Sequence, residues 1–270
     1  MSDRCPRQRG FALLIVLWTL ALLALLGSTV LATARQDAQQ ARNQRDAAVL
    51  QAAAHGAMQQ AIFWLLDNSN RHWPADDVPH PIRIGPALVV VRIQDENDKV
   101  NPNIASSDLL RALLVQVGAN PMVAASVADA IVAWRLGGGG PGRPNATTAL
   151  YAAAGRAYAP SGAPFGSLDE LGNVLGMTPE LLLRLRPHLT LFTDDDPDAG
   201  TRDPVVARAL AAIGESSTGV GPGGPQVVSI TADAQGAGAA RFAEREIVRS
   251  NTEAVGQRYE VLDYERFWND

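Results

Sequence analysis

The chain has 270 residues, 47% of them hydrophobic, with a formal net charge of −5 and a single cysteine, Cys5. This length allows one or two domains with a buried core, and one cysteine excludes a framework of internal disulfides. Only one lysine, Lys99, is present, and an acidic chain without clustered basic residues argues against nucleic acid as a partner.

The first element in the chain is an uncharged apolar run over 11–34, which directly follows a short basic leader, 1–10. A helix over this run would be about 36 Å long, and the hydrocarbon core of a bilayer is about 30 Å thick. We therefore predict a transmembrane helix. Because the arginines precede the run, the positive-inside rule keeps the N-terminus cytoplasmic and exports the rest as a single-pass protein.

Three interpretations of this segment are open. Ala32-Thr33-Ala34 fits the cleavage rule of a secretory signal peptide, although the apolar run is longer than such peptides carry. A plain signal anchor is the second. The third rests on the junction Arg9-Gly10-Phe11, which resembles the processing site of type IV prepilins and pseudopilins. That resemblance implies cleavage between Gly10 and Phe11 by a prepilin peptidase, followed by N-methylation of Phe11, and we favour it.

The polar segment 35–67 continues the helix, because it contains no proline and is rich in strong helix formers. A helical wheel predicts one face of mostly small residues, which we interpret as a stalk that packs in a helical bundle below and on a folded head above. A solvated helix with incidental alanines is the alternative. The predicted face comprises Ala38, Ala41, Ala48, Val49, Ala52, Gly56 and Phe63.

The remaining chain is predicted to run from strands to helices and back to strands. A strand pair is expected within Pro81–Gln94, where β-branched and polar residues alternate. Helix starts are predicted at Ser167, Thr178 and Asp203, each of which has the side chain of an N-cap. The predicted segments are 68–99 for the first strands, 100–214 for a helical insert, 215–226 for a linker and 227–270 for the final strands.

Together these features resemble the minor pseudopilin K family of the type II (general) secretion pathway. The resemblance implies an α+β fold in which a long N-terminal transmembrane helix packs on an antiparallel sheet, with a large inserted all-α domain of two SAM-like halves. The matching stretches are RGFALLIVLWTLALLALL (9–26), DENDKVNPN (95–103), DAIVAWR (129–135), FGSLDELGNVLGMTPELLLRLRPHLT (165–190) and YEVLDYER (259–266).

The resemblance also implies a mechanical role without enzymatic activity. The subunit would cap the tip of the periplasmic pseudopilus with other minor pseudopilins, and so support protein export across the outer membrane. Further implied partners are the major pseudopilin, the inner-membrane assembly platform and the prepilin peptidase, which places the chain in the inner membrane with a periplasmic C-terminal domain. Ile15 takes the fifth position after cleavage, where most pilin-type subunits carry Glu. A tip subunit has no neighbour above it whose amine needs that carboxylate.

Two other functions remain open. One is a minor pilin of a surface type IV pilus. The other is a membrane-anchored DNA receptor, because Leu171–Leu189 could form a helix-hairpin-helix that binds phosphates. The acidic composition argues against the receptor, since Arg184 and Arg186 alone are too few basic residues.

Candidate sites for a cofactor are weak, and none is expected to be required. The acidic run Asp194, Asp195, Asp196 and Asp198 could supply some oxygens to calcium, but such a site needs six or more converging ligands. The stretch 95–103 lacks the glycine and the terminal glutamate of an EF-hand loop, so turn and cap roles are favoured there. The four histidines have no metal-ligand spacing, and no catalytic grouping is predicted.

Replacing Gly10 by a bulky residue is expected to leave the precursor uncut, because the peptidase must read the glycine at the cleavage junction. The mass and the N-terminal sequence of the mature protein are the measurement. A wild-type chain that begins with N-methylated Phe11 supports prepilin processing. A Gly10 variant of normal mature size would refute it, and a mature chain beginning at Arg35 would instead indicate a secretory signal peptide.

Overall fold

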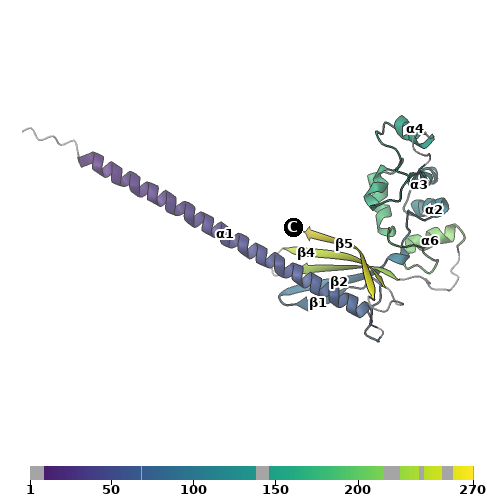
Figure 1. The fold of residues 1–270 in the computed structure, drawn as a ribbon, viewed down its shortest axis with the longest axis horizontal. Helices are drawn as coiled ribbons and strands as arrows, with labels where there is room; N and C mark the ends of the chain where they lie inside the picture. The colour runs from purple at the N-terminus through teal and green to yellow at the C-terminus, as the bar shows by residue number, and fades with distance from the viewer. Residues whose placement is uncertain are drawn as a thin grey trace, which may run out of the picture.

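A computed structural model describes residues 9–67, 69–137, 146–215, 226–236, 240–250 and 258–269. The chain forms one long helix, a five-stranded antiparallel sheet and a separate group of short helices (Figure 1). The predicted α+β class is therefore confirmed. Most of the predicted leader 1–10 and of the predicted linker 215–226 lies outside the described residues.

The long helix α1 spans Arg9–Leu65 without interruption. Its first part extends away from the rest of the molecule, and its last part packs on the sheet (Figure 1). Across the described residues, no helix combines enough length with enough apolarity to cross a bilayer. The transmembrane role of 11–34 stays a prediction.

The face of α1 that packs on the sheet differs from the predicted one. Ala48, Ala52, Gly56 and Phe63 are exposed. The predicted packing face is therefore wrong for this part of the helix. The physical reason is the amount of apolar surface that each face can bury. A neighbouring face of the helix carries larger apolar side chains, so packing that face removes more apolar surface from water. The buried residues are Leu50, Ala53, Ala54, Ala57, Met58, Ala61, Ile62 and Leu65.

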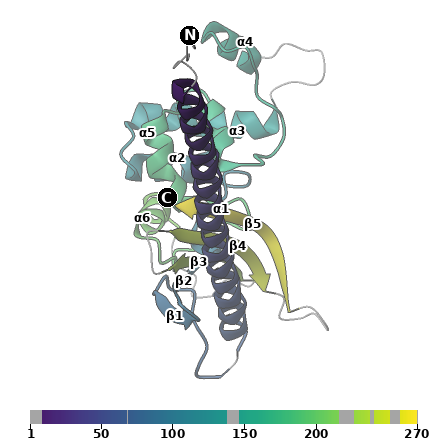
Figure 2. The ribbon, with the colours of Figure 1, turned by 90° about the vertical axis from the view of Figure 1, so that its left-hand side faces the viewer.

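The sheet has the strand order β1-β2-β3-β4-β5, with every neighbouring pair antiparallel. Along β2, inward and outward residues alternate, and α1 covers the inward face. Figure 2 shows α1 crossing the strands, with β1 on one side and β5 on the other. The strands are β1 (His80–Ile84), β2 (Ala87–Asp95), β3 (Val227–Gln235), β4 (Arg241–Ser250) and β5 (Tyr259–Asn269).

The short helices lie between β2 and β3 in the chain and enclose a hydrophobic core of their own, centred on residues such as Leu113, Ile131 and Leu210. We call this segment the helical insert. It sits beyond the sheet, away from the N-terminal end of α1 (Figure 1). Its helices are η1 (Glu96–Asp98), α2 (Ser107–Gln116), α3 (Pro121–Leu136), α4 (Ala146–Ala153), η2 (Leu168–Asn173), α5 (Pro179–Leu185), η3 (Arg186–His188) and α6 (Pro204–Ala212).

The helix starts follow the predicted cap residues, with one difference. Thr178 accepts a hydrogen bond from the backbone N–H of Leu181, and Asp203 accepts one from Val205. Ser167 also caps a helix, but that helix, η2, is a short 3₁₀ segment. The hydroxyl of Ser167 accepts the backbone N–H of Asp169, two residues on.

Gly176 occupies a backbone position that only glycine fits, because its φ is +83° and a Cβ there would lie 2.9 Å from Cγ2 of Val127. Gly214 has the same φ with no atom near its missing Cβ. We expect Gly214→Ala to lower the free energy of unfolding by about 1 kcal/mol through backbone strain alone. Gly176→Ala should cost about 2–4 kcal/mol, because steric overlap is added.

Chemical denaturation of both variants measures the difference between them. Equal losses would mean that the contact between residue 176 and Val127 contributes nothing.

Candidate functional site: the junction between sheet and insert

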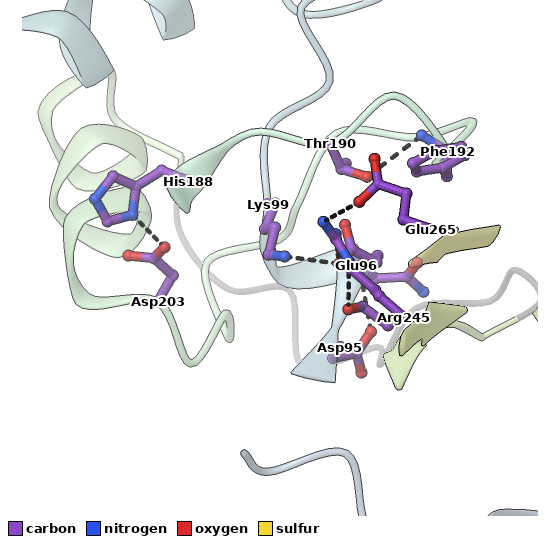
Figure 3. Close-up of polar contacts among 11 residues, drawn as sticks. Asp95, Glu96, Lys99, His188, Thr190, Phe192, Asp203, Arg245 and Glu265 are labelled. Atoms are coloured by element: carbon purple, nitrogen blue, oxygen red, sulfur yellow. Dashed lines mark hydrogen bonds and ion pairs between the residues drawn. The ribbon is translucent and has the colours of Figure 1, made fainter. Parts of the chain in front are cut away.

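The junction between the sheet and the helical insert is built around one buried carboxylate. Glu96 follows β2 directly and is only 1% exposed. Its Oε1 lies 2.6 Å from Nζ of Lys99 at the start of the insert and 3.5 Å from Nη2 of Arg245 on β4 (Figure 3). A buried carboxylate needs such cations, because desolvation without them would cost several kcal/mol. Glu96 therefore couples the insert to the sheet.

Arg245 extends this coupling across the sheet. Its Nε donates a hydrogen bond of 3.1 Å to the hydroxyl of Ser229 on β3, and its Nη1 lies 3.9 Å from a carboxylate oxygen of Glu265 on β5. One guanidinium thus contacts side chains from β3, from β5 and from the start of the insert. A planar group with several donors in a fixed geometry suits this role better than lysine would.

Backbone hydrogen bonds join the first residues of the helical insert to the segment around the end of η3. The N–H of Val100 donates to the carbonyl of His188 at 2.9 Å, and the N–H of Thr190 donates to the carbonyl of Val100 at 3.0 Å. The buried amide of Asn101 donates to the carbonyl of Thr193 at 2.7 Å. The prediction of turn and cap roles for 95–103 is confirmed, since Asp95 and Asn101 each accept a backbone N–H two residues on.

A histidine–aspartate pair lies next to these hydrogen bonds. Nδ1 of His188 is 2.5 Å from Oδ2 of Asp203 (Figure 3). Burial alone would raise the pKa of Asp203, but hydrogen bonds from His188 and from the N–H groups of Val205 and Val206 outweigh it and hold that pKa below its ordinary value. The ionised carboxylate is thus the form that the fold stabilises. This contribution to stability is present above the ordinary aspartate pKa and is lost as the pH falls through the lowered one.

Arg202 connects the same region to the loop before β1. Its Nη1 donates to the carbonyl of Ala75 at 2.6 Å, and its guanidinium lies 3.6 Å from Asp95 and 3.7 Å from Asp98. These residues line an open pocket of about 300 Å³ together with His188. Burial raises the pKa of Asp95, and the charge of Asp98 adds to the shift. Carboxylates outnumber cations in the lining of this pocket, and Arg202 lies between Asp95 and Asp98.

The predicted calcium residues do not converge in this structure. Asp194, Asp195, Asp196 and Asp198 are all exposed. Asp194 pairs with Arg249 at 3.3 Å, and Asp198 accepts the N–H of Gly200 at 2.7 Å. This arrangement does not fit the closed oxygen cage that calcium requires. Calcium binding stays a prediction.

The segment considered for DNA contact, Leu171–Leu189, packs within the helical insert. Leu171, Leu181 and Leu185 are buried in the insert core. The first half of the predicted hairpin is the 3₁₀ segment η2, and Arg186 forms an ion pair with Asp169. The pairing leaves fewer positive charges for phosphate.

The predicted processing residues all lie at the start of α1. Phe11 is 69% exposed, and Ile15 is also exposed. Gly10 belongs to the same helix. Cleavage and methylation at this junction stay predictions.

Sequence reasoning missed a second polar cluster, formed by His55 on α1 with Glu244 and Glu246 on β4. Burial and the charge of Glu244 raise the pKa of Glu246, and His55 counteracts them. The spacing Glu-x-Glu within a strand was an available signal, because residues two apart share one face of a sheet. The partner histidine could not be found, since only the fold brings α1 to β4.

These features define the class of the fold, an α+β protein with a helical insert between the second and third strands of its antiparallel sheet. Residues 87–194 match the family model described as "Type II secretion system (T2SS), protein K". The match confirms the resemblance seen in the sequence over this stretch: residues 87–194 are similar to type II secretion system protein K.

A solved structure has the same fold. It is a chain of the crystal structure of the GspK-GspI-GspJ complex from the type 2 secretion system of enterotoxigenic Escherichia coli. The TM-score is 0.60 at 16% sequence identity, over 86% of this chain and 99% of that one. No curated protein sequence matches the chain.

Removing the cation beside Glu96 is expected to destabilise the junction. Lys99→Met leaves the buried carboxylate with Arg245 alone, and we expect a loss of about 3 kcal/mol in the free energy of unfolding, the low end for breaking a buried ion pair. The matched control is Arg111→Met, which breaks an exposed pair with Asp108 of the same 2.6 Å length. That change should cost at most about 1 kcal/mol.

Urea denaturation followed by circular dichroism provides the measurement. A Lys99→Met variant no less stable than Arg111→Met would contradict a structural role for the Glu96 pair. The double variant Lys99→Met/Glu96→Gln should recover part of the loss, because it also removes the buried charge.

Proposed function

We propose that the chain caps the tip of the periplasmic pseudopilus of a type II secretion system, together with other minor pseudopilins, and thereby supports protein export across the outer membrane. One observation carries the proposal. The helical insert lies beyond the sheet, on the side away from the N-terminal end of α1 (Figure 1). In a filament whose subunits all point their helices toward the membrane, that end faces the tip.

Steric exclusion is the mechanism that we infer. A subunit stacked above this one would have to occupy the volume of the insert, whose core is closely packed with apolar side chains. The junction around Glu96 opposes displacement of the insert, because moving it would separate buried charges. Filament growth would therefore proceed only from below this subunit.

The first part of α1 supplies the proposed anchor. Its large apolar side chains are exposed, and so large an apolar surface requires a cover. We propose that the inner membrane is the cover before assembly, with the N-terminus cytoplasmic and the head periplasmic, and that neighbouring helices replace it in the filament. The exposed residues include Phe11, Leu13, Leu14, Ile15, Val16, Leu17, Trp18, Leu20, Leu22, Leu23, Leu25 and Leu26.

Lateral partners are proposed to pack along the outward face of α1. Ala48, Ala52 and Gly56 are exposed there, and small side chains allow a neighbouring helix to approach closely. The structural relative was crystallised in a complex of GspK with GspI and GspJ. We propose that two smaller minor pseudopilins take the equivalent places beside this chain, and that the major pseudopilin follows below them.

Co-purification of the full-length chain with the two smaller minor pseudopilins of the same secretion system tests the proposal. A ternary complex is expected, and Ala52→Arg should weaken it about tenfold or more, because a charged side chain would enter the helix contact. The control is Met122→Arg, at an exposed position on the insert, which should leave the complex unchanged. Absence of any complex at high micromolar concentration would refute the proposed assembly.

A further inference from the structure

The polar cluster beneath α1 is an unusual feature of an otherwise apolar helix–sheet contact. Glu244 and Glu246 pair in register with Ala232 and Ile230 of β3, which belong to the core under α1. Both carboxylates therefore point toward the helix. They are 0% and 5% exposed, respectively. If both carboxylates are ionised, two like charges on one strand face repel each other strongly unless a positive charge lies between them.

Each of these carboxylates has an oxygen without a hydrogen-bond partner among the described residues, Oε1 of Glu244 and Oε2 of Glu246. Buried polar atoms are nearly always satisfied, so two such atoms side by side require an explanation. The other oxygen of Glu244 accepts a hydrogen bond of 2.9 Å from the hydroxyl of Tyr264, which in turn accepts one of 2.6 Å from Nε of Arg266. This pair of contacts from β5 holds Glu244 with Oε1 directed to the cluster.

His55 completes the cluster from the helix. Its Nδ1 lies 3.6 Å from Oε1 of Glu244. One ligand atom from each of the three residues lies within 4.8 Å of the others. The imidazole is 57% exposed, so the cluster is reachable from solvent although the carboxylates are buried.

We propose that His55, Glu244 and Glu246 bind a divalent transition-metal ion of the zinc class. One imidazole nitrogen and two carboxylate oxygens are ligands that zinc accepts, at distances of about 2.0–2.2 Å, and small side-chain shifts would bring the three atoms to that range. Calcium and magnesium fit poorly, because they prefer oxygen shells of six or more ligands. The hydrogen bond from Tyr264 is the kind of outer contact that orients a ligating carboxylate.

The ion would connect α1 to β4, two elements that are otherwise held together by apolar packing. It would neutralise both buried carboxylates and leave a fourth ligand position open on the exposed side of His55. The proposal does not depend on the position of this subunit in a filament, so the two can fail independently.

The test uses the full-length, untagged chain in detergent, with Cys5→Ser so that no thiol can bind metal. After treatment with a chelator, the protein is titrated with zinc chloride by calorimetry, and the bound metal is measured by mass spectrometry. We expect about one zinc per chain and a rise in melting temperature on zinc addition. Calcium chloride should produce neither effect.

Variants separate a metal site from a structural ion pair. Glu246→Gln and His55→Ala should weaken zinc binding at least tenfold, whereas His72→Ala, which removes an exposed histidine outside the cluster, should not. In chelator, Glu246→Gln should be at least as stable as the parent, because it removes a buried charge.

The proposal would be overturned if the parent took up no zinc at about 100 μM. It would fail equally if Glu246→Gln bound zinc as well as the parent does.

Discussion

The position of the insert on the sheet is held in large part by one buried carboxylate and its two cations. Glu96 lies in the first turn of the insert, directly after β2. Its carboxylate is shared between Lys99, three residues on, and Arg245, which belongs to β4. Apolar contacts are tolerant of small rotations, but buried charges are not, because separation leaves each of them desolvated and unpaired. The core of the helical insert and the core between α1 and the sheet are in this way held in one relative orientation.

Each core follows a separate sequence pattern, and this explains what could be predicted. The alternation in Pro81–Gln94 and the caps at Thr178 and Asp203 are local signals, and the strands and helices begin close to where those signals place them. Helix α4 was not predicted, because it has only eight residues and follows a stretch rich in glycine and proline. The packing face of α1 was assigned to the wrong arc, since small and large apolar residues alternate around the helix and only the sheet decides between them.

The polar sites were predicted less well for a related reason. Glu96 and Arg245 are far apart in the sequence, as are His55 and Glu246, and each pair meets only because β4 is placed between β3 and β5 beneath α1. The carboxylates of the acidic run that begins at Asp194 are exposed, because closeness in the sequence does not by itself bring side chains to one point. The charged residues that stabilise this fold are the ones that the tertiary structure buries. Their burial could not be predicted from local sequence patterns.

The solitary lysine has a practical consequence for mapping neighbours. The amine of Lys99 is largely buried and paired with the carboxylate of Glu96. Reagents that modify primary amines should therefore react poorly with the folded head. Crosslinking through amines would thus miss contacts that the head makes with other proteins. Acid-directed coupling, or a cysteine introduced on the outer arc of α1, is the chemistry that would make its contacts visible.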